Sequence, residues 1–203
     1  MERTSISDYN QDKFVTNTLT DAIKKNNQGI SVMMQLPIDN YIMANISSVK
    51  QLTDNNFKGV YISTQRPYNN MKDLFSRNGI DIKNLKIIDC INISNSKDIK
   101  IIAQSVIKSL KELKSKKKFI LIDSLTTLGL YRSQEELSNF SDVILNITKK
   151  NGFENVIVLF GVAEDLSKKE FIKKITTNVD EVIQVLNKSA KYSKEVLSRD
   201  VLT

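Results

Sequence analysis

The chain of 203 residues has 40% apolar and 26% charged side chains, as is typical of a soluble globular protein with one sizeable core. It contains no apolar run near the roughly 20 residues of a membrane span, and its polar segment 1–13 lacks a signal-peptide pattern, so we expect a cytoplasmic protein. The absence of histidine excludes Ser–His and Cys–His nucleophilic chemistry, and with Cys90 as the single cysteine it argues against a zinc site.

The predicted elements alternate between short apolar strands and longer amphipathic helices. In chain order they are a helix at 11–26, a strand at 30–36, a helix at 40–54, a strand at 59–64, a helix at 68–78, a strand at 85–91, a helix at 97–115, a strand at 119–122, a helix at 134–150, a strand at 155–160, a helix at 167–178 and a strand at 181–186. Such alternation indicates βαβ units. We therefore predict an α/β fold, a three-layer α/β/α sandwich with a mostly parallel central sheet.

One domain accounts for the whole sequence, 1–203. It consists of the N-terminal helix, a core at 28–186 and a polar C-terminal tail at 187–203. We expect Cys90, inside the apolar run 85–91, to act as a small buried hydrophobe.

Ligands of open parallel α/β sheets bind outside the carboxyl ends of the strands, at a switch point in strand order. The segments that follow the predicted strands are therefore the first candidates for a site. They are 36–41, 64–67, 123–131 and 161–165.

In the segment Phe119–Ser124, four apolar residues are followed by Asp123 and Ser124. An aspartate at this place in a nucleotide-binding sheet reaches the Mg²⁺ of ATP, although a strand that ends in Asp can also simply begin a turn. The continuation through Tyr131 resembles the second nucleotide-site motif of the RecA/KaiC-like family, whose members carry Ile-Asp-Ser-Leu followed by a small apolar and polar run.

The resemblance continues in order over about 28–186. Further matching segments are the second strand at 59–64, the strand at 84–89 after Gly79-Ile80-Asp81, the helix at 133–152 and the last core strand at 179–183. The resemblance implies a RecA-like P-loop NTPase fold and a relative of the archaeal KaiC-like and RadA-like ATPases.

The ATP-binding loop that this family carries after its first strand is missing. A P-loop reads G-x-x-x-x-G-K-[ST], in which backbone amides curl round the phosphates, Lys neutralises them and the hydroxyl binds Mg²⁺. Here the segment 35–42 contains no glycine, Tyr41 stands in the place of the lysine and Ile42 in that of the hydroxyl, and Asp39 would repel a triphosphate.

A second family feature is also absent. Family members carry one or two glutamates after the second strand, usually regarded as the base that activates water, whereas this chain has Gln65-Arg66-Pro67. Neither Gln nor Arg accepts a proton at neutral pH. We therefore expect no catalytic residue, no metal, no cofactor and no ATP binding, but a vestigial nucleotide site made of Pro37, Asn40, Tyr41, Gln65, Arg66, Asp123 and Ser124.

Two residues of this site, Asp123 and Arg66, each have two possible roles. Asp123 is either a strand-end residue held by turn hydrogen bonds from Ser124 and Thr126 or a surviving metal ligand. Arg66 either pairs with Asp39, Asp123 or Glu164 or binds an anionic ligand directly. Tyr41 is expected to fill the emptied pocket with its ring.

The leading functional hypothesis is a non-catalytic pseudo-ATPase that acts as a regulatory or protein-interaction module, with itself or with an active ATPase paralogue. Small KaiC-like proteins of this shape resemble archaeal chains that stand alone or accompany signalling, motility or recombination ATPases. The alternatives are a DNA-associated recombinase paralogue and an atypical nucleotide-binding ATPase that uses Arg66 and Asp123. The net charge of +7 and the basic clusters at 114–118, 168–174 and 188–194 keep nucleic acid as an alternative partner.

Overall fold

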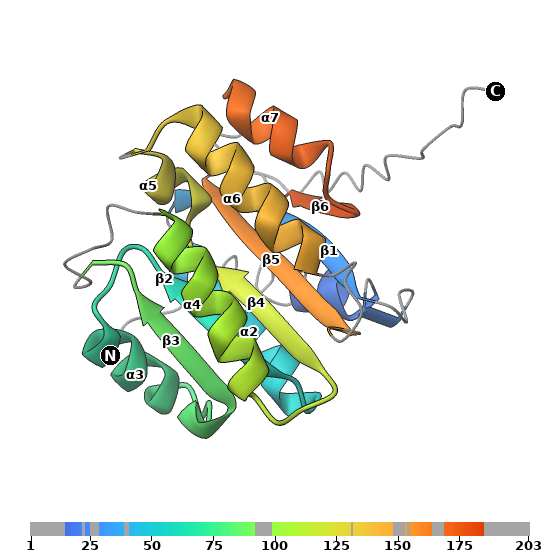
Figure 1. Ribbon diagram of the computed structural model, residues 1–203. Helices are drawn as coiled ribbons and strands as arrows, with labels where there is room; N and C mark the ends of the chain where they lie inside the picture. Colours follow the sequence, from blue (N-terminus) through green and yellow to red (C-terminus); the bar gives the residue numbers. More distant parts are fainter. Residues whose placement is uncertain are drawn as a thin grey trace.

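The computed structural model describes residues 15–21, 23–24, 29–38, 41–91, 99–130, 132–147, 153, 155–163 and 169–184. A helix occupies the described part of 15–24. The elements after it are β1 (Ile30–Leu36), α2 (Tyr41–Asp54), β2 (Lys58–Ser63), α3 (Tyr68–Arg77), the short 3₁₀ turn η2 (Ile82–Asn84), β3 (Leu85–Asp89), α4 (Ile99–Glu112), β4 (Lys118–Ile122), α5 (Leu125–Gly129), α6 (Gln134–Ile147), β5 (Val156–Ala163), α7 (Glu170–Thr176) and β6 (Glu181–Gln184) (Figure 1).

The strands form one six-stranded sheet in the order β3-β2-β4-β5-β1-β6, and every neighbouring pair is parallel. The predicted α/β fold with a parallel sheet is therefore confirmed. The strands are continuous apolar runs because helices cover both faces of the sheet. Successive side chains point to opposite faces, and both sets are therefore buried. β5 is buried at all eight of its positions.

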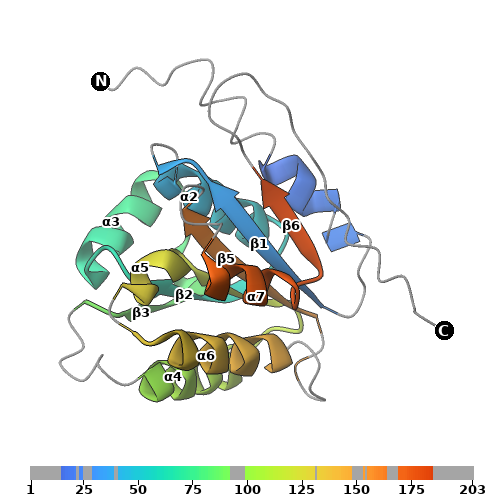
Figure 2. The same cartoon turned by 90° about the horizontal axis from the view of Figure 1, so that it is seen from above.

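The helices lie in two layers, one on each face of the sheet (Figure 2). The connections from β1 to β2 and from β2 to β3 run toward the β3 edge, and their helices α2 and α3 share one apolar core with the helix at 15–24. The later connections run toward the β6 edge, and α4, α6 and α7 share the core on the other face. A single hand of crossover produces this division, because reversing the direction of travel moves the helix to the opposite face.

Several predicted bounds are wrong by one to three residues, as at the strand predicted at 85–91, which ends at Asp89, and two larger details also differ. The helix α5 was not predicted, because five residues are too few to show a helical period. β5 continues through Gly161 to Ala163, whereas the sequence placed 161–165 after the strand. Gly161 suits a strand here because a Cβ at this position would lie 2.3 Å from the carbonyl oxygen of Asp123, so only glycine lets the two backbones approach this closely. The rest of that predicted segment, 164–165, is outside the described residues.

The edge strand β6 is fastened to β1 by one side chain. The Asp180 carboxylate accepts hydrogen bonds from the Ser31 backbone N–H at 2.9 Å and from the Ser31 hydroxyl at 2.6 Å. The Asp180 N–H in turn donates to the Ser31 carbonyl at 3.0 Å. These bonds set the register of a strand only four residues long. No helix in the part of the chain that the structure describes is long and apolar enough to cross a membrane.

Candidate functional site

The strand order has its switch point between β1 and β5. The two strands are neighbours, yet the chain leaves β1 toward the β3 edge and leaves β5 toward the β6 edge. The helices that follow them therefore lie on opposite faces and leave a crevice outside the carboxyl ends. A pocket of about 280 Å³ lies at this crevice. The residues described around it are Ile38, Tyr41, Gln65, Ser124, Thr126, Thr127, Leu130 and Ala163.

The pocket has a polar wall of hydroxyls and an amide, and an apolar rim. The Ser124 hydroxyl caps the short helix α5 by accepting the Thr127 N–H at 3.0 Å. It also shares hydrogen bonds with the hydroxyls of Thr126 at 3.0 Å and Thr127 at 2.8 Å. The Gln65 side-chain amide, which follows β2, donates to the Thr127 hydroxyl at 2.9 Å. None of the described residues that line the pocket carries a charge.

Asp123 lies beneath this wall and is 5% exposed. One carboxylate oxygen accepts the Thr64 N–H at 2.9 Å and the Thr64 hydroxyl at 2.6 Å, and the other faces the Ser63 hydroxyl at 3.4 Å. Burial raises the pKa of Asp123 from 3.8 to about 6, although the bonds from Thr64 and Ser63 and the nearby Ser124 backbone lower it in part.

The partners of the Asp123 carboxylate differ from those expected. The sequence predicts turn hydrogen bonds to Asp123 from Ser124 and Thr126. In the structure the hydroxyls of those two residues bond to each other, and apart from the nearby Ser124 backbone the partners of the Asp123 side chain lie at the end of β2. The physical reason is the strand order: β2 is the neighbour of β4, so the residue after each strand meets the other. The carboxylate is therefore occupied by bonds that join two strands.

Tyr41 begins α2 and is 6% exposed. Its hydroxyl faces the hydroxyls of Ser124 and Thr126, which lower its pKa in part, but no described group forms a hydrogen bond of good geometry with it. Burial is the larger effect and raises the pKa of Tyr41 well above its usual value, with Asp123 adding to it. Tyr41 thus lines the pocket as a buried ring with an unsatisfied polar tip.

Sequence reasoning missed Asn45, which lies one turn further along α2. Its side-chain N–H donates to the Asp123 carbonyl at 3.0 Å, and its own carbonyl oxygen is buried without a described partner. The available signal was an asparagine on the apolar face of a helix, because a polar side chain is rarely buried there without a hydrogen bond. Asn45 links α2 to the same point at which Gly161 passes β4.

The remaining predicted site residues lie around the crevice or beyond it. Pro37 follows β1 directly but does not line the pocket, and Asn40 lies outside the described residues. Arg66 is exposed, and its backbone carbonyl accepts the Ser63 hydroxyl at 2.7 Å. No ion pair joins Arg66 to Asp123 within the described part of the chain, and its other proposed partners, Asp39 and Glu164, lie outside it.

Cys90 follows β3 and is half-buried against the core beneath α4. Burial, with Asp123 and Asp89 nearby, raises the pKa of the Cys90 thiol to about 12, and Arg132 opposes this in part. A thiol in this state has little thiolate at neutral pH and is unreactive. Among the residues that the structure describes, no group of three or more Cys, Asp or Glu side chains could hold a metal ion.

Comparison with known proteins shows the fold alone. No family model matches the chain, and no curated protein matches it either. Among solved structures it is similar to a KaiC-like protein from the hyperthermophilic archaeon Pyrococcus horikoshii OT3, with 15% identity and a TM-score of 0.55 over 82% of this chain and 76% of that one. The chain therefore has a RecA-type, KaiC-like α/β fold.

Proposed function

We propose that the chain is a non-catalytic KaiC-like module that binds a protein partner, either another copy of itself or an active ATPase of the same fold, through the carboxyl edge of its sheet. The observation that carries this proposal is the pocket at the switch point. It lies where this class of sheet binds its ligand, yet its described lining is uncharged and its rim is apolar.

The chemistry of the crevice argues against a nucleotide triphosphate. A phosphate site needs converging backbone N–H groups, a cation and, for Mg²⁺, a hydroxyl or carboxylate. None of the six glycines of the chain precedes a lysine, and the segment 35–42 holds no Lys or Arg. Pro37 has no N–H to offer. Asp123 is occupied by Thr64 and Ser63, and the buried Tyr41 lines the pocket.

The surface around the pocket supports docking of a protein. Six large apolar side chains are exposed among the described residues, and four of them lie just after a strand or on the first turn of the helix that follows it. These four are Ile38, Met43, Tyr68 and Ile91, and Leu130 stands at the end of the short helix α5 that follows β4. Apolar side chains gathered on one edge are typical of an interaction surface. Ile38 and Leu130, 66% and 62% exposed, stand on the rim of the pocket itself.

Sedimentation velocity over a range of protein concentrations tests this proposal. Ile38→Asp and Leu130→Asp each place a charge on the apolar rim, and Val143→Asp, an exposed apolar position on α6, is the matched control. We expect the wild type and Val143→Asp to assemble as concentration rises and the two rim variants to stay monomeric, with or without millimolar Mg·ATP.

Two outcomes would count against the proposal. Wild-type protein that remains monomeric contradicts self-association, and the same four proteins are then mixed with an active ATPase of this fold from the same organism. Assembly of this chain alone that requires Mg·ATP contradicts the non-catalytic assignment.

A further inference from the structure

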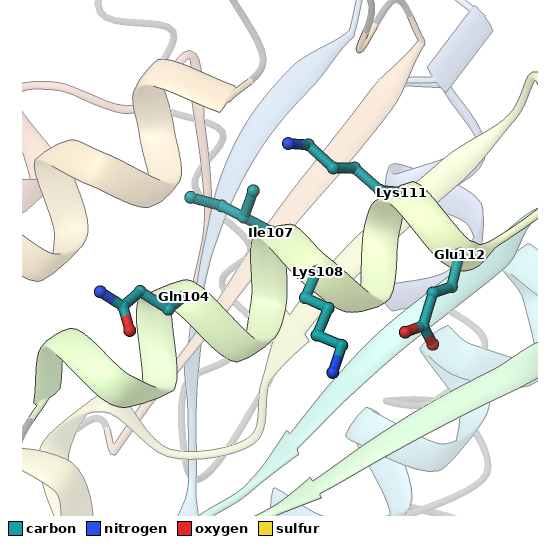
Figure 3. Close-up of a pocket in the computed structure, with 5 residues that line it drawn as sticks. All are labelled: Gln104, Ile107, Lys108, Lys111 and Glu112. Atoms are coloured by element: carbon teal, nitrogen blue, oxygen red, sulfur yellow. The ribbon is translucent and has the colours of Figure 1, made fainter.

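A second surface, separate from the carboxyl edge, lies along the exposed side of α4. An open groove of about 460 Å³ follows this helix and is lined by Gln104, Ile107, Lys108, Lys111 and Glu112 (Figure 3). In Figure 3, Ile107 and Lys111 project to one side of the helix and Lys108 and Glu112 to the other, as the spacing of four residues requires. The groove therefore runs along the outer face of α4.

The floor of the groove is apolar. Ile107 is half-buried and packs against the core that α4 shares with α6, so that part of its side chain remains accessible. Lys111 lies beside it on the same side of the helix and Lys108 lies on the other side, and each has a four-carbon stem whose ammonium group extends toward water. An apolar side chain of a partner can therefore bury its surface on Ile107 and along the neighbouring Lys111 stem.

The rim of the groove and the chain that follows it are strongly basic. The segment 99–118 contains seven lysines, and its single acidic residue, Glu112, pairs with Lys86 at 3.2 Å. Five of these lysines are exposed and form no ion pair with a described residue, namely Lys108, Lys111, Lys114, Lys116 and Lys117. The face thus carries an uncompensated positive charge beside an apolar floor.

We propose that the α4 groove binds an acidic segment of a partner protein, with an apolar side chain of that segment seated on Ile107 and its carboxylates facing Lys108 and Lys111. The charge complementarity steers the encounter, and the apolar contact slows dissociation. The proposal does not rest on the carboxyl-edge proposal, because it concerns a different surface and a different partner chemistry.

The described residues favour a protein over a nucleic acid as the occupant. Single-stranded nucleic acids bind through aromatic stacking and Arg contacts, but segment 99–118 holds neither aromatic nor Arg residues. The nearest rings are engaged, because Lys117 lies 5.4 Å from the centre of the Phe57 ring and Lys118 lies 5.9 Å from that of Phe153. A charged phosphate backbone would gain no favourable contact from the apolar floor of the groove.

Fluorescence anisotropy with defined probes tests the inference. The probes are a labelled helical peptide in which glutamates surround leucines at every third or fourth position, the same peptide with serine for leucine, and labelled single- and double-stranded oligonucleotides. We expect the leucine peptide to bind at low salt at least roughly tenfold more tightly than the serine peptide and either oligonucleotide.

Variants of the full chain locate the binding. Ile107→Ser and the double variant Lys108→Gln/Lys111→Gln should each lower the affinity for the leucine peptide by roughly tenfold. Lys72→Gln, which changes an exposed lysine on the opposite face, should leave this affinity unchanged. The double variant changes only exposed side chains, so it remains informative if Ile107→Ser unfolds.

The proposal is overturned by equal affinity for the two peptides, by no binding of the leucine peptide, or by tighter binding of an oligonucleotide. Unchanged affinity in the double glutamine variant also overturns it. Oligonucleotide binding that the double variant abolishes would assign this face to nucleic acid.

Discussion

Replacing Asp123 by asparagine should stabilise the protein at neutral pH. The pKa of the carboxyl rises from 3.8 to about 6 on folding, chiefly because of burial. A group whose pKa is raised in the folded state binds its proton more tightly there, so folding is favoured at low pH and opposed as the pH rises through 6. At about 1.4 kcal/mol for each pH unit, the full effect is about 3 kcal/mol and is reached near pH 7–8.

Asparagine removes this cost and keeps the hydrogen bonds. Its carbonyl oxygen can accept from the N–H and hydroxyl of Thr64, as the carboxylate does. Its amide can donate to the Ser63 oxygen, because the Ser63 proton is directed at the Arg66 carbonyl at 2.7 Å. At pH 4 the wild-type carboxyl is largely protonated and the two proteins should be about equally stable, whereas near pH 8 the variant should be more stable by about 2–3 kcal/mol.

Urea unfolding followed by circular dichroism from pH 4 to pH 8 measures this difference. Asp73→Asn, at an exposed aspartate on α3, is the control, and its free energy of unfolding should change with pH in the same way as that of the wild type. The reasoning is refuted if Asp123→Asn differs from the wild type by the same amount at every pH, or if it is less stable near pH 8.

Three further substitutions test the packing around the crevice by urea unfolding at pH 7. Tyr41→Phe removes a buried hydroxyl that has no described partner, so it should be neutral or stabilising by up to about 1 kcal/mol, and a loss of more than 1 kcal/mol would show that the hydroxyl is satisfied. Gly161→Ala forces a methyl group against the Asp123 carbonyl and should cost at least about 1–3 kcal/mol, whereas an unchanged midpoint would contradict the close approach. Asp180→Ala removes both bonds to Ser31 and should cost about 1–3 kcal/mol, with the amide protons of β6 losing protection against hydrogen exchange first.

The strands were predictable because each carries its own signal. A strand buried on both faces reads as an unbroken β-branched and apolar run, and the predicted 30–36 coincides with β1. The predicted strand at 155–160 is shorter than β5 because a glycine such as Gly161 usually indicates the end of a strand. The need for glycine there arises from the neighbouring strand β4, and a local pattern cannot show which strands are neighbours.

The site was predictable as a place but not as a set of contacts. The rule that ligands bind at the carboxyl ends of strands selected the segments holding Tyr41, Gln65 and Ser124, and these line one pocket. The bonds between Asp123 and Thr64 join residues 59 positions apart, and they depend on β2 lying beside β4. No local sequence pattern predicts the strand order β3-β2-β4-β5-β1-β6, so these hydrogen-bond partners could be identified only from the structure.

Isothermal titration calorimetry of the purified chain with Mg·ATP tests the central claim most directly. The claim is that the crevice at the ends of β1 and β5 has no phosphate-binding chemistry. It predicts no saturable heat up to millimolar Mg·ATP, for the wild type and for Asp123→Asn alike. Saturable binding with a micromolar dissociation constant, lost in Asp123→Asn, would contradict it and would restore Asp123 as a metal ligand.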